Sequence, residues 1–478
     1  MNRKDDGIKT SRSIILNVIT SAISIVVSLF TTIIITRIIS VSDLGIATSF
    51  VTLKNILNLI CLVSIYISIN RMILDIKGKD YEYLSSIYIF SSAFCLFSFI
   101  LYLIFHSFLN SIFGFNTSMM ILMFTMIFLI NACNLTINYW NFKNKYKYMF
   151  IYNLLASPVA QILSLVFASL MTSHKYLGRI IGIDLFNILF GLGCGIYILY
   201  RGRFSFNTDY VKKSLKICIP MIPHLLAQIL LSSCDLLMIR NIVGNNAAGI
   251  YSMAYTISNI LYTILIQLFM PWSPWVYRRI KNNEIDAINK NSNLLIVGAG
   301  FLCLCLYTVA PDMIHIFLGK EYFEAAFIVA PITVGIFFQI MYIFFYDIEY
   351  YYKKNKQIAC FSVIASIINI VLNYIFIKKF GYIAAAYTTF ISYLILLVLH
   401  YFGMKRVDKR KFYNIKILFI SSVCLLVIAL LFIVTKNNFY LRYIIMLSFG
   451  IILLKKYYKD IKIFLNSIIK SKECSNES

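Results

Sequence analysis

Acidic residues, proline and glycine are scarce in this chain. Its 478 residues include 20 Asp and Glu, 7 Pro and 19 Gly, and all charged residues together make up 13%. A globular domain typically has about 25% charged residues. Hydrophobic residues reach 60%, above the roughly 45–50% of an average chain. This composition excludes a soluble enzyme, a disordered chain and a small disulfide-stabilised domain, and it indicates a polytopic membrane protein.

Motifs for covalent or metal chemistry are also missing. The 11 Cys residues stand singly, nearly all inside apolar runs, and no C-x-x-C sequence occurs. We interpret them as reduced thiols that pack as small hydrophobic side chains. The sequence contains no Walker A motif, no H-E-x-x-H zinc motif and no nucleophile elbow. We therefore expect a protein that is not an enzyme and that holds no metal or other cofactor.

Apolar runs long enough to cross a membrane dominate the chain, since a spanning helix needs about 20 mainly apolar residues. These runs predict an all-α polytopic membrane protein with about fourteen transmembrane helices. They lie near residues 13–36, 46–69, 84–109, 117–138, 150–173, 176–200, 215–238, 247–270, 291–310, 326–350, 358–377, 381–402, 414–435 and 437–454.

The distribution of basic residues supports this count. With both termini in the cytoplasm, 34 of the 44 Lys and Arg residues fall on the cytoplasmic side, 9 fall outside, and Lys54 lies within the second helix. Every inner segment then has at least three basic residues and no outer loop has more than two. This alternation is typical of a bacterial inner-membrane protein. The net charge of +24 is therefore assigned to membrane orientation, and no nucleic-acid partner is expected.

The chain also carries an internal repeat. The segment R-I-I-S-V-S-D-L-G-I begins at Arg37, and N-I-L follows ten residues after Gly45. A similar segment begins at Arg240, and N-I-L again follows ten residues after Gly249. Coincidence in a biased sequence is the alternative to duplication. The repeat predicts two pseudo-symmetric six-helix lobes of the same orientation, which is typical of alternating-access transporters with substrate at the midplane.

The predicted domains follow from this repeat. The N-lobe covers residues 1–205 and the C-lobe covers residues 206–405. Two extra helices occupy residues 406–456, and a basic cytoplasmic tail occupies residues 457–478.

Lys54 is the most unusual charged residue within the predicted spans. It lies about ten residues into the second helix, roughly 15 Å deep at 1.5 Å per residue. A Lys at such a depth costs about 2.5–3.5 kcal/mol on insertion scales. Asn58 shares its helix face and Asn55 lies beside it. Lys54 could bind an anionic substrate, or it could form a structural ion pair.

Two aspartates are the candidate partners of Lys54. Asp184 in the sixth helix and Asp235 in the seventh lie in the same outer half of the membrane. Either carboxylate could take up H⁺ or Na⁺ to couple transport to an ion gradient, as intramembrane carboxylates do in other transporters. Hydrogen-bonded packing is the alternative for both.

Amide and hydroxyl side chains recur along three further helices. They suit the binding of a sugar, but such groups also hold helices together at about 0.6 kcal/mol each. The candidates for substrate binding on these helices are Gln228, Tyr255, Asn259, Tyr262, Asn369 and Asn373.

Two other features have simpler interpretations. Gly191, Gly193 and Gly195 form G-x-G-x-G inside an apolar helix without a preceding strand, so close helix packing explains them better than nucleotide binding. Asp347 and Glu349 are near the predicted cytoplasmic end of the tenth helix. We expect both carboxylates to be solvated or paired with neighbouring lysines.

Several segments resemble a known transporter family. The matching segments are Thr36-Arg37 through Asp43-Leu-Gly45-Ile, Ile219-Pro220 through Asp235-Leu-Leu-Met-Ile-Arg240, Gly249-Ile-Tyr251-Ser, Gly319-Lys-Glu-Tyr322, and Asn369-Ile-Val-Leu-Asn373 through Phe380-Gly381-Tyr-Ile-Ala-Ala-Ala386. Over about residues 10–405 the chain is similar to the polysaccharide transporter family. These are the Wzx-type O-antigen (lipopolysaccharide) and capsule flippases of the MATE/MOP superfamily.

The resemblance implies a V-shaped pair of lobes around a central cavity. It implies that an undecaprenyl-diphosphate-linked oligosaccharide is flipped to the outer leaflet among membrane lipids, with a polymerase and a chain-length regulator as further partners. In related lipid II flippases the last two helices flank a groove for the prenyl tail. Relatives line the cavity with several basic residues, whereas here only Lys54 is deep and Arg37 and Arg240 lie nearer the helix ends. The headgroup is therefore expected to contact mainly Tyr, Asn and Gln.

Two alternatives stay open at this point, and a third is excluded. A cation-coupled multidrug exporter of the MATE type would favour twelve helices and an acidic cavity. A lipid II flippase would favour a more basic lining. A membrane glycosyltransferase or polymerase would need a large outer loop with catalytic Arg or Asp, and every predicted outer loop is short.

Overall fold

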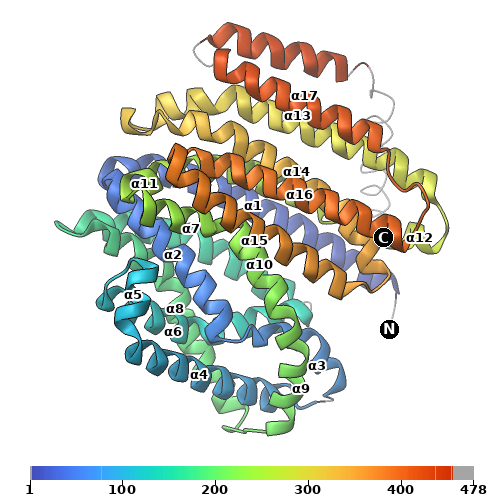
Figure 1. Cartoon of the computed structure of the whole chain (residues 1–478). Coiled ribbons are helices and arrows are strands. Elements are labelled where there is room, and N and C mark those ends of the chain that lie inside the picture. Colours follow the sequence, from blue (N-terminus) through green and yellow to red (C-terminus); the bar gives the residue numbers. More distant parts are fainter. Residues whose placement is uncertain (1–2, 77, 144, 436–437, 454, 456–478) are drawn as a thin grey trace. The chain divides into compact units, whose positions relative to one another are not determined.

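The computed structural model describes residues 3–76, 78–143, 145–435, 438–453 and 455. Within these ranges the regular secondary structure is entirely helical (Figure 1). Twelve helices are long and apolar enough to cross a membrane, and two shorter apolar helices lie at Ala22–Ile38 and Phe439–Leu453. Each of the fourteen predicted runs overlaps one of these segments of the described residues, so the predicted fold class is confirmed. The whole predicted tail at 457–478 lies outside the described residues.

The helices of the first half of the chain are α1 (Arg3–Ile38), α2 (Val41–Cys61), η1 (Ile65–Ser68), α3 (Ile69–Asp75), α4 (Asp80–Ile104), α5 (His106–Phe113), α6 (Thr117–Phe142), α7 (Tyr146–Leu170) and α8 (Lys175–Arg201). Those of the second half are α9 (Thr208–Cys218), η2 (Ile219–Met221), α10 (Ile222–Ile242), α11 (Asn245–Phe269), α12 (Trp272–Lys281), α13 (Ile285–Phe317), η3 (Lys320–Tyr322), α14 (Ala325–Tyr351), α15 (Asn355–Phe380), α16 (Ala384–Val407) and α17 (Ile415–Thr435).

The helices group into two compact units. Unit 1 comprises residues 1–15, 253–361 and 386–478, and unit 2 comprises residues 16–252 and 362–385. In unit 1, α14 is the most enclosed of the spanning helices among the described residues, because 78% of its most apolar stretch is buried. This burial agrees with a helix that is hydrophobic on all sides. The division into lobes at residues 1–205 and 206–405 stays a prediction.

The second span ends earlier than the sequence predicts. The predicted helix at 46–69 is wrong at its end, because α2 stops at Cys61. Val63 and Ser64 then adopt left-handed φ values of 52° and 46°, which an L-residue rarely adopts within a helix. Short helices η1 and α3 continue the chain. At the other end Ser40 caps α2, since its side chain accepts a hydrogen bond from the Asp43 N–H at 3.1 Å.

The repeated glycines pack against each other in unit 2. A Cβ on Gly45 would collide with the Asn245 carbonyl oxygen, and a Cβ on Gly249 would collide with the Val41 carbonyl oxygen. Gly249 follows Gly45 by 204 residues, and Asn245 follows Val41 by the same number. The contact is therefore reciprocal, as in an interface with two-fold symmetry. This geometry supports the internal duplication and explains why both positions lack a side chain.

Candidate functional site

Lys54 on α2 forms a buried ion pair with Asp184 on α8. The Lys54 ammonium contacts the Asp184 Oδ2 directly, and the two residues are 7% and 3% exposed. The predicted pairing is thus present, and Asp184 rather than Asp235 is the partner. Removing one member of such a pair leaves an uncompensated buried charge, at a cost of about 3–5 kcal/mol. Within the pair, each buried charge is neutralised by the other.

Small residues bring α8 to the position that this ion pair requires. A Cβ on Gly178 would lie 2.6 Å from the Phe167 carbonyl carbon, and one on Gly182 would lie 2.6 Å from the Ser164 nitrogen. Both glycines therefore let the first half of α8 lie directly against the backbone of α7. Asp184 follows half a turn after Gly182, on the stretch that this close packing fixes.

Asp235 on α10 belongs to a separate polar group in unit 2. Its Oδ2 accepts a hydrogen bond of 2.5 Å from the Tyr251 hydroxyl, and its Oδ1 accepts one of 2.9 Å from the Leu236 N–H. The aspartate is 2% exposed. Tyr251 lies two residues after Gly249, where the first copy of the repeat has Ala47, so this donor is present in the second copy and not in the first.

The polar face of α10 contacts α15. Gln228 donates to the Ser362 hydroxyl at 3.2 Å, and the Cys234 thiol lies 3.3 Å from the Asn369 Oδ1. Asn373 donates to the same amide oxygen at 3.1 Å. Asn369 and Asn373 are fully buried. These contacts favour the helix-packing role for this set of amides, one of the two roles that the sequence left open.

The remaining predicted residues lie apart from these groups. Arg240 is tied to the α5–α6 turn, where it donates to the Gly114 carbonyl at 2.7 Å and covers the Phe115 ring at 3.7 Å. Arg37 and Asn55 are exposed, and Asn58 is half-buried. On the unit 1 part of α11, the predicted residue Asn259 is exposed, and Tyr255 and Tyr262 are half-buried.

The prediction that Asp347 and Glu349 are solvated or paired with neighbouring lysines is wrong, because both are buried and hydrogen-bonded to other side chains. Glu349 is fully buried and accepts hydrogen bonds from His400 Nδ1 at 2.8 Å and from Gln357 Nε2 at 3.1 Å. Gly403, one turn after His400, leaves the space for this cluster, because a Cβ there would collide with the Glu349 carboxylate. Asp347 is 1% exposed and accepts from Ser273 and Tyr277 at 2.8 and 3.1 Å.

The physical reason is the position of three other helices. Gln357 on α15 and His400 on α16 hold Glu349. Ser273 and Tyr277 on α12 hold Asp347. Glu349 lies only two residues before the end of α14. A position so close to a helix end suggests exposure to solvent, but side chains from other helices bury Glu349. The only hint of this cluster in the sequence is the spacing of His400 and Gly403, three residues apart in α16. This spacing is too common to predict a buried carboxylate.

A further buried cation lies at the start of the last apolar helix. Arg442 is 2% exposed, donates to the Thr308 carbonyl at 2.6 Å and pairs with Asp312 at 2.5 Å. Tyr443 donates to the same carboxylate at 3.1 Å. The contacts explain how the last predicted span accommodates an arginine near its start.

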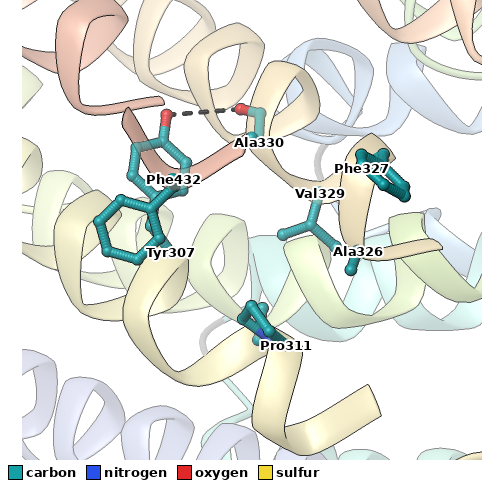
Figure 2. A pocket seen from close by; sticks show the side chains of 8 residues that line it. Tyr307, Pro311, Ala326, Phe327, Val329, Ala330 and Phe432 are labelled. Carbon is teal, nitrogen blue, oxygen red and sulfur yellow. Dashed lines mark hydrogen bonds between the residues drawn. The ribbon is translucent and has the colours of Figure 1, made fainter. Parts of the chain in front are cut away.

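An apolar recess lies between α13, α14 and α17 of unit 1 (Figure 2). Its enclosed volume is only about 20 Å³, and small side chains such as Ala310, Ala326 and Ala330 line it. Figure 2 shows the Tyr307 hydroxyl directed at the Ala330 carbonyl, at 3.4 Å. Phe432 packs beside Tyr307 with ring centroids 5.8 Å apart. The lining is therefore mostly hydrocarbon, with the Tyr307 hydroxyl and the Ala330 carbonyl as polar groups.

Comparison with known families identifies the chain. The profile of a family described as "Polysaccharide biosynthesis protein" matches residues 34–327. The chain belongs to this family. It is also 21% identical over 273 residues to the capsular polysaccharide biosynthesis protein CapF of Staphylococcus aureus, a match that covers 54% of this chain. The match spans 62% of the length of CapF.

Solved structures show the same fold. The lipid II flippase MurJ in an inward closed conformation superposes with a TM-score of 0.70 at 19% identity, covering 94% of this chain and 99% of MurJ. A multidrug resistance MATE transporter in an inward-facing conformation superposes with a TM-score of 0.57 at 12% identity, covering 83% and 99%. The fold is that of the MOP superfamily, as the resemblance implied.

Proposed function

We propose that the protein is a flippase rather than an enzyme. In this proposal it moves an undecaprenyl-diphosphate-linked oligosaccharide, the repeat unit of an O-antigen or capsule, from the cytoplasmic to the outer leaflet of the bacterial inner membrane. The family match over residues 34–327 carries the proposal, because it joins polysaccharide biosynthesis to a fold shared with transporters. The excess of Lys and Arg in alternate loops supports cytoplasmic termini.

The chemistry of such a substrate requires a protein. Sugar hydroxyls and a diphosphate cannot enter hydrocarbon without losing their hydrogen bonds to water. A cavity that opens to each leaflet in turn lets the headgroup cross while the prenyl tail stays in lipid. An inside-negative potential favours outward movement of an anion by about 2.3 kcal/mol per charge per 100 mV.

The Lys54–Asp184 pair is proposed as the charged element of this cycle. While the pair is closed, the ammonium is neutralised by the carboxylate. Protonation of Asp184 would release Lys54 to bind a diphosphate oxygen, so proton uptake and substrate binding would favour each other. Asp235, held by Tyr251, is the alternative site for H⁺ or Na⁺.

The exposed amides and phenols are proposed to contact sugar hydroxyls. Asn55 and Asn259 are exposed, whereas the buried Asn369 and Asn373 hold helices together. A polymerase and a chain-length regulator are proposed as pathway partners because they would use the flipped product.

Analysis of prenyl-linked lipids in a deletion strain tests the proposal. We expect an undecaprenyl-diphosphate oligosaccharide to accumulate in the cytoplasmic leaflet while lipid II stays unchanged. The likeness to MurJ makes lipid II flipping the second candidate, and trapped lipid II would support it. Unchanged lipid intermediates together with new sensitivity to cationic drugs would instead favour a MATE-type exporter.

A further inference from the structure

The central glycine of G-x-G-x-G in α8 lacks the packing role of its neighbours. A Cβ on Gly191 would collide with the Leu129 carbonyl oxygen, and one on Gly195 would lie 2.7 Å from the Tyr88 hydroxyl. Gly193 has no atom within 4 Å of an added Cβ. Close packing therefore explains the first and third glycines, while the second opens onto free space.

That space is a surface recess of about 370 Å³ in unit 2, formed by α4, α6 and α8. Gly193 forms its floor, and Leu189 and Tyr197 stand one turn away on either side with 61% and 51% exposure. Leu84, Phe190 and Ile198 add further apolar lining. A groove of this kind along a membrane-spanning helix has the shape and polarity to receive a hydrocarbon chain.

Aromatic rings and cations gather where the recess approaches the helix ends. Tyr81, Tyr139 and Trp140 line it there, as aromatic residues do at the level of lipid headgroups. The Arg201 guanidinium lies 5.4 Å from the Tyr81 ring, and the Lys145 ammonium lies 5.5 Å from the Tyr139 ring.

One carboxylate lies in this cluster and is already engaged. Asp80 accepts a hydrogen bond of 3.0 Å from the Tyr139 hydroxyl and pairs with Lys143 at 2.7 Å. Arg201, Lys143 and Lys145 together outnumber it by two positive charges. The polar end of the recess is therefore complementary to an anionic headgroup.

We propose that this recess binds an anionic glycerophospholipid, with an acyl chain over Gly193 and its phosphate beside Arg201 and Lys145. Basic pockets between helices at a membrane surface are suited to such headgroups. None of the residues that line the recess is among those proposed to contact the oligosaccharide, so its occupation would tune the protein's stability or rate without supplying substrate.

Trp140 offers a local probe of this site, because the chain has three Trp and the other two can be replaced by W272F and W275F. The single-Trp protein would be placed in phosphatidylcholine vesicles containing an equal mole fraction of either brominated phosphatidylglycerol or brominated phosphatidylcholine. We expect the anionic lipid to quench Trp140 with about fivefold higher apparent affinity. Arg201→Gln should reduce this preference.

Gly193→Leu should fill the recess and abolish the preference for phosphatidylglycerol. Gly298→Leu is the matched control, since Gly298 on α13 also has open space around an added Cβ and should leave the preference intact. If the W272F and W275F double variant is unstable, Gly193→Leu and Gly298→Leu can be compared in a protein that keeps all three Trp. Native mass spectrometry then measures how much phosphatidylglycerol each variant retains. Equal quenching by both lipids, or an unchanged preference in Gly193→Leu, would overturn the proposal.

Discussion

Two buried charged groups, one in each unit, differ in how they are built. In unit 2 a full cation, Lys54, meets one carboxylate, Asp184, on a neighbouring helix. In unit 1 the Glu349 carboxylate is held by an imidazole and an amide, His400 and Gln357. The first group depends on opposite charges and is lost when either charge is removed. The second depends on hydrogen bonds, so its members keep partial support when one of them changes.

The largest effect is expected at the unit 2 pair. Lys54→Ala should abolish polysaccharide export and lower the free energy of unfolding by about 3–5 kcal/mol, because Asp184 would keep a buried charge without a partner. Export is measured as surface polymer and insertion as the amount of protein in the membrane fraction. Lys212→Ala, at an exposed position on α9, is the control and should export normally.

The reversed pair sharpens the comparison. Lys54→Asp combined with Asp184→Lys should recover membrane protein levels that each single change loses, since the double variant restores opposite charges. No recovery in the double variant would show that the orientation of the pair, rather than its neutrality, is required.

The unit 1 cluster should respond more gradually. Glu349→Ala should lower the free energy of unfolding by about 1–3 kcal/mol for each donor left unpaired, and Glu349→Gln should cost less than Glu349→Ala. Thermal unfolding in detergent measures both variants. Glu82→Ala removes an exposed pair with Lys79 and should be nearly neutral. Equal losses for Gln and Ala would contradict the hydrogen-bonded description.

The reciprocal glycine contact predicts equal effects at two distant positions. Gly45→Ala and Gly249→Ala should each destabilise unit 2 by about 1–3 kcal/mol, because each Cβ meets the backbone of the other helix. Chemical unfolding of the two variants measures this. A large loss at one position and none at the other would contradict the two-fold contact.

The smallest effect is expected at the α16–α17 junction of unit 1. Burial opposes ionisation of Asp408, but hydrogen bonds from Arg410 and Tyr352 outweigh it and lower the pKa of this carboxyl to about 2. Because an unfolded Asp has a pKa near about 3.9, the pair stabilises the native state above that pH. The contribution falls away as the pH drops toward 2. Arg410→Gln should flatten this part of the pH dependence of thermal unfolding.

The sequence predicted two kinds of feature: those set by the composition of a single segment, and those that follow from the large cost of burying a charge. Hydropathy placed the fourteen apolar helices, and the depth of Lys54 required a buried partner that Asp184 supplies. The repeat predicted equivalent glycines, although not that they touch. The end of α2 could not be predicted, because Val63 and Ser64 are neither glycine nor proline and the surrounding structure holds them in the left-handed region.

Burial near helix ends was also beyond prediction. Glu349 and Asp347 stand beside lysines in the sequence, and local sequence alone favours solvent or an ion pair. Their actual partners, His400, Ser273 and Tyr277, are more than fifty residues away along the chain. Tertiary packing therefore decides which buried polar side chains contact one another, and local sequence does not reveal it.

A translocation assay in proteoliposomes tests the proposed function most directly. The purified protein would be reconstituted with undecaprenyl-diphosphate oligosaccharide in one leaflet, and lipid II in parallel vesicles, and the appearance of each headgroup in the other leaflet would be followed. We predict transfer of the oligosaccharide lipid by the native protein, little transfer of lipid II, and no transfer by Lys54→Ala. Transfer of lipid II alone, or equal transfer by Lys54→Ala, would contradict the account.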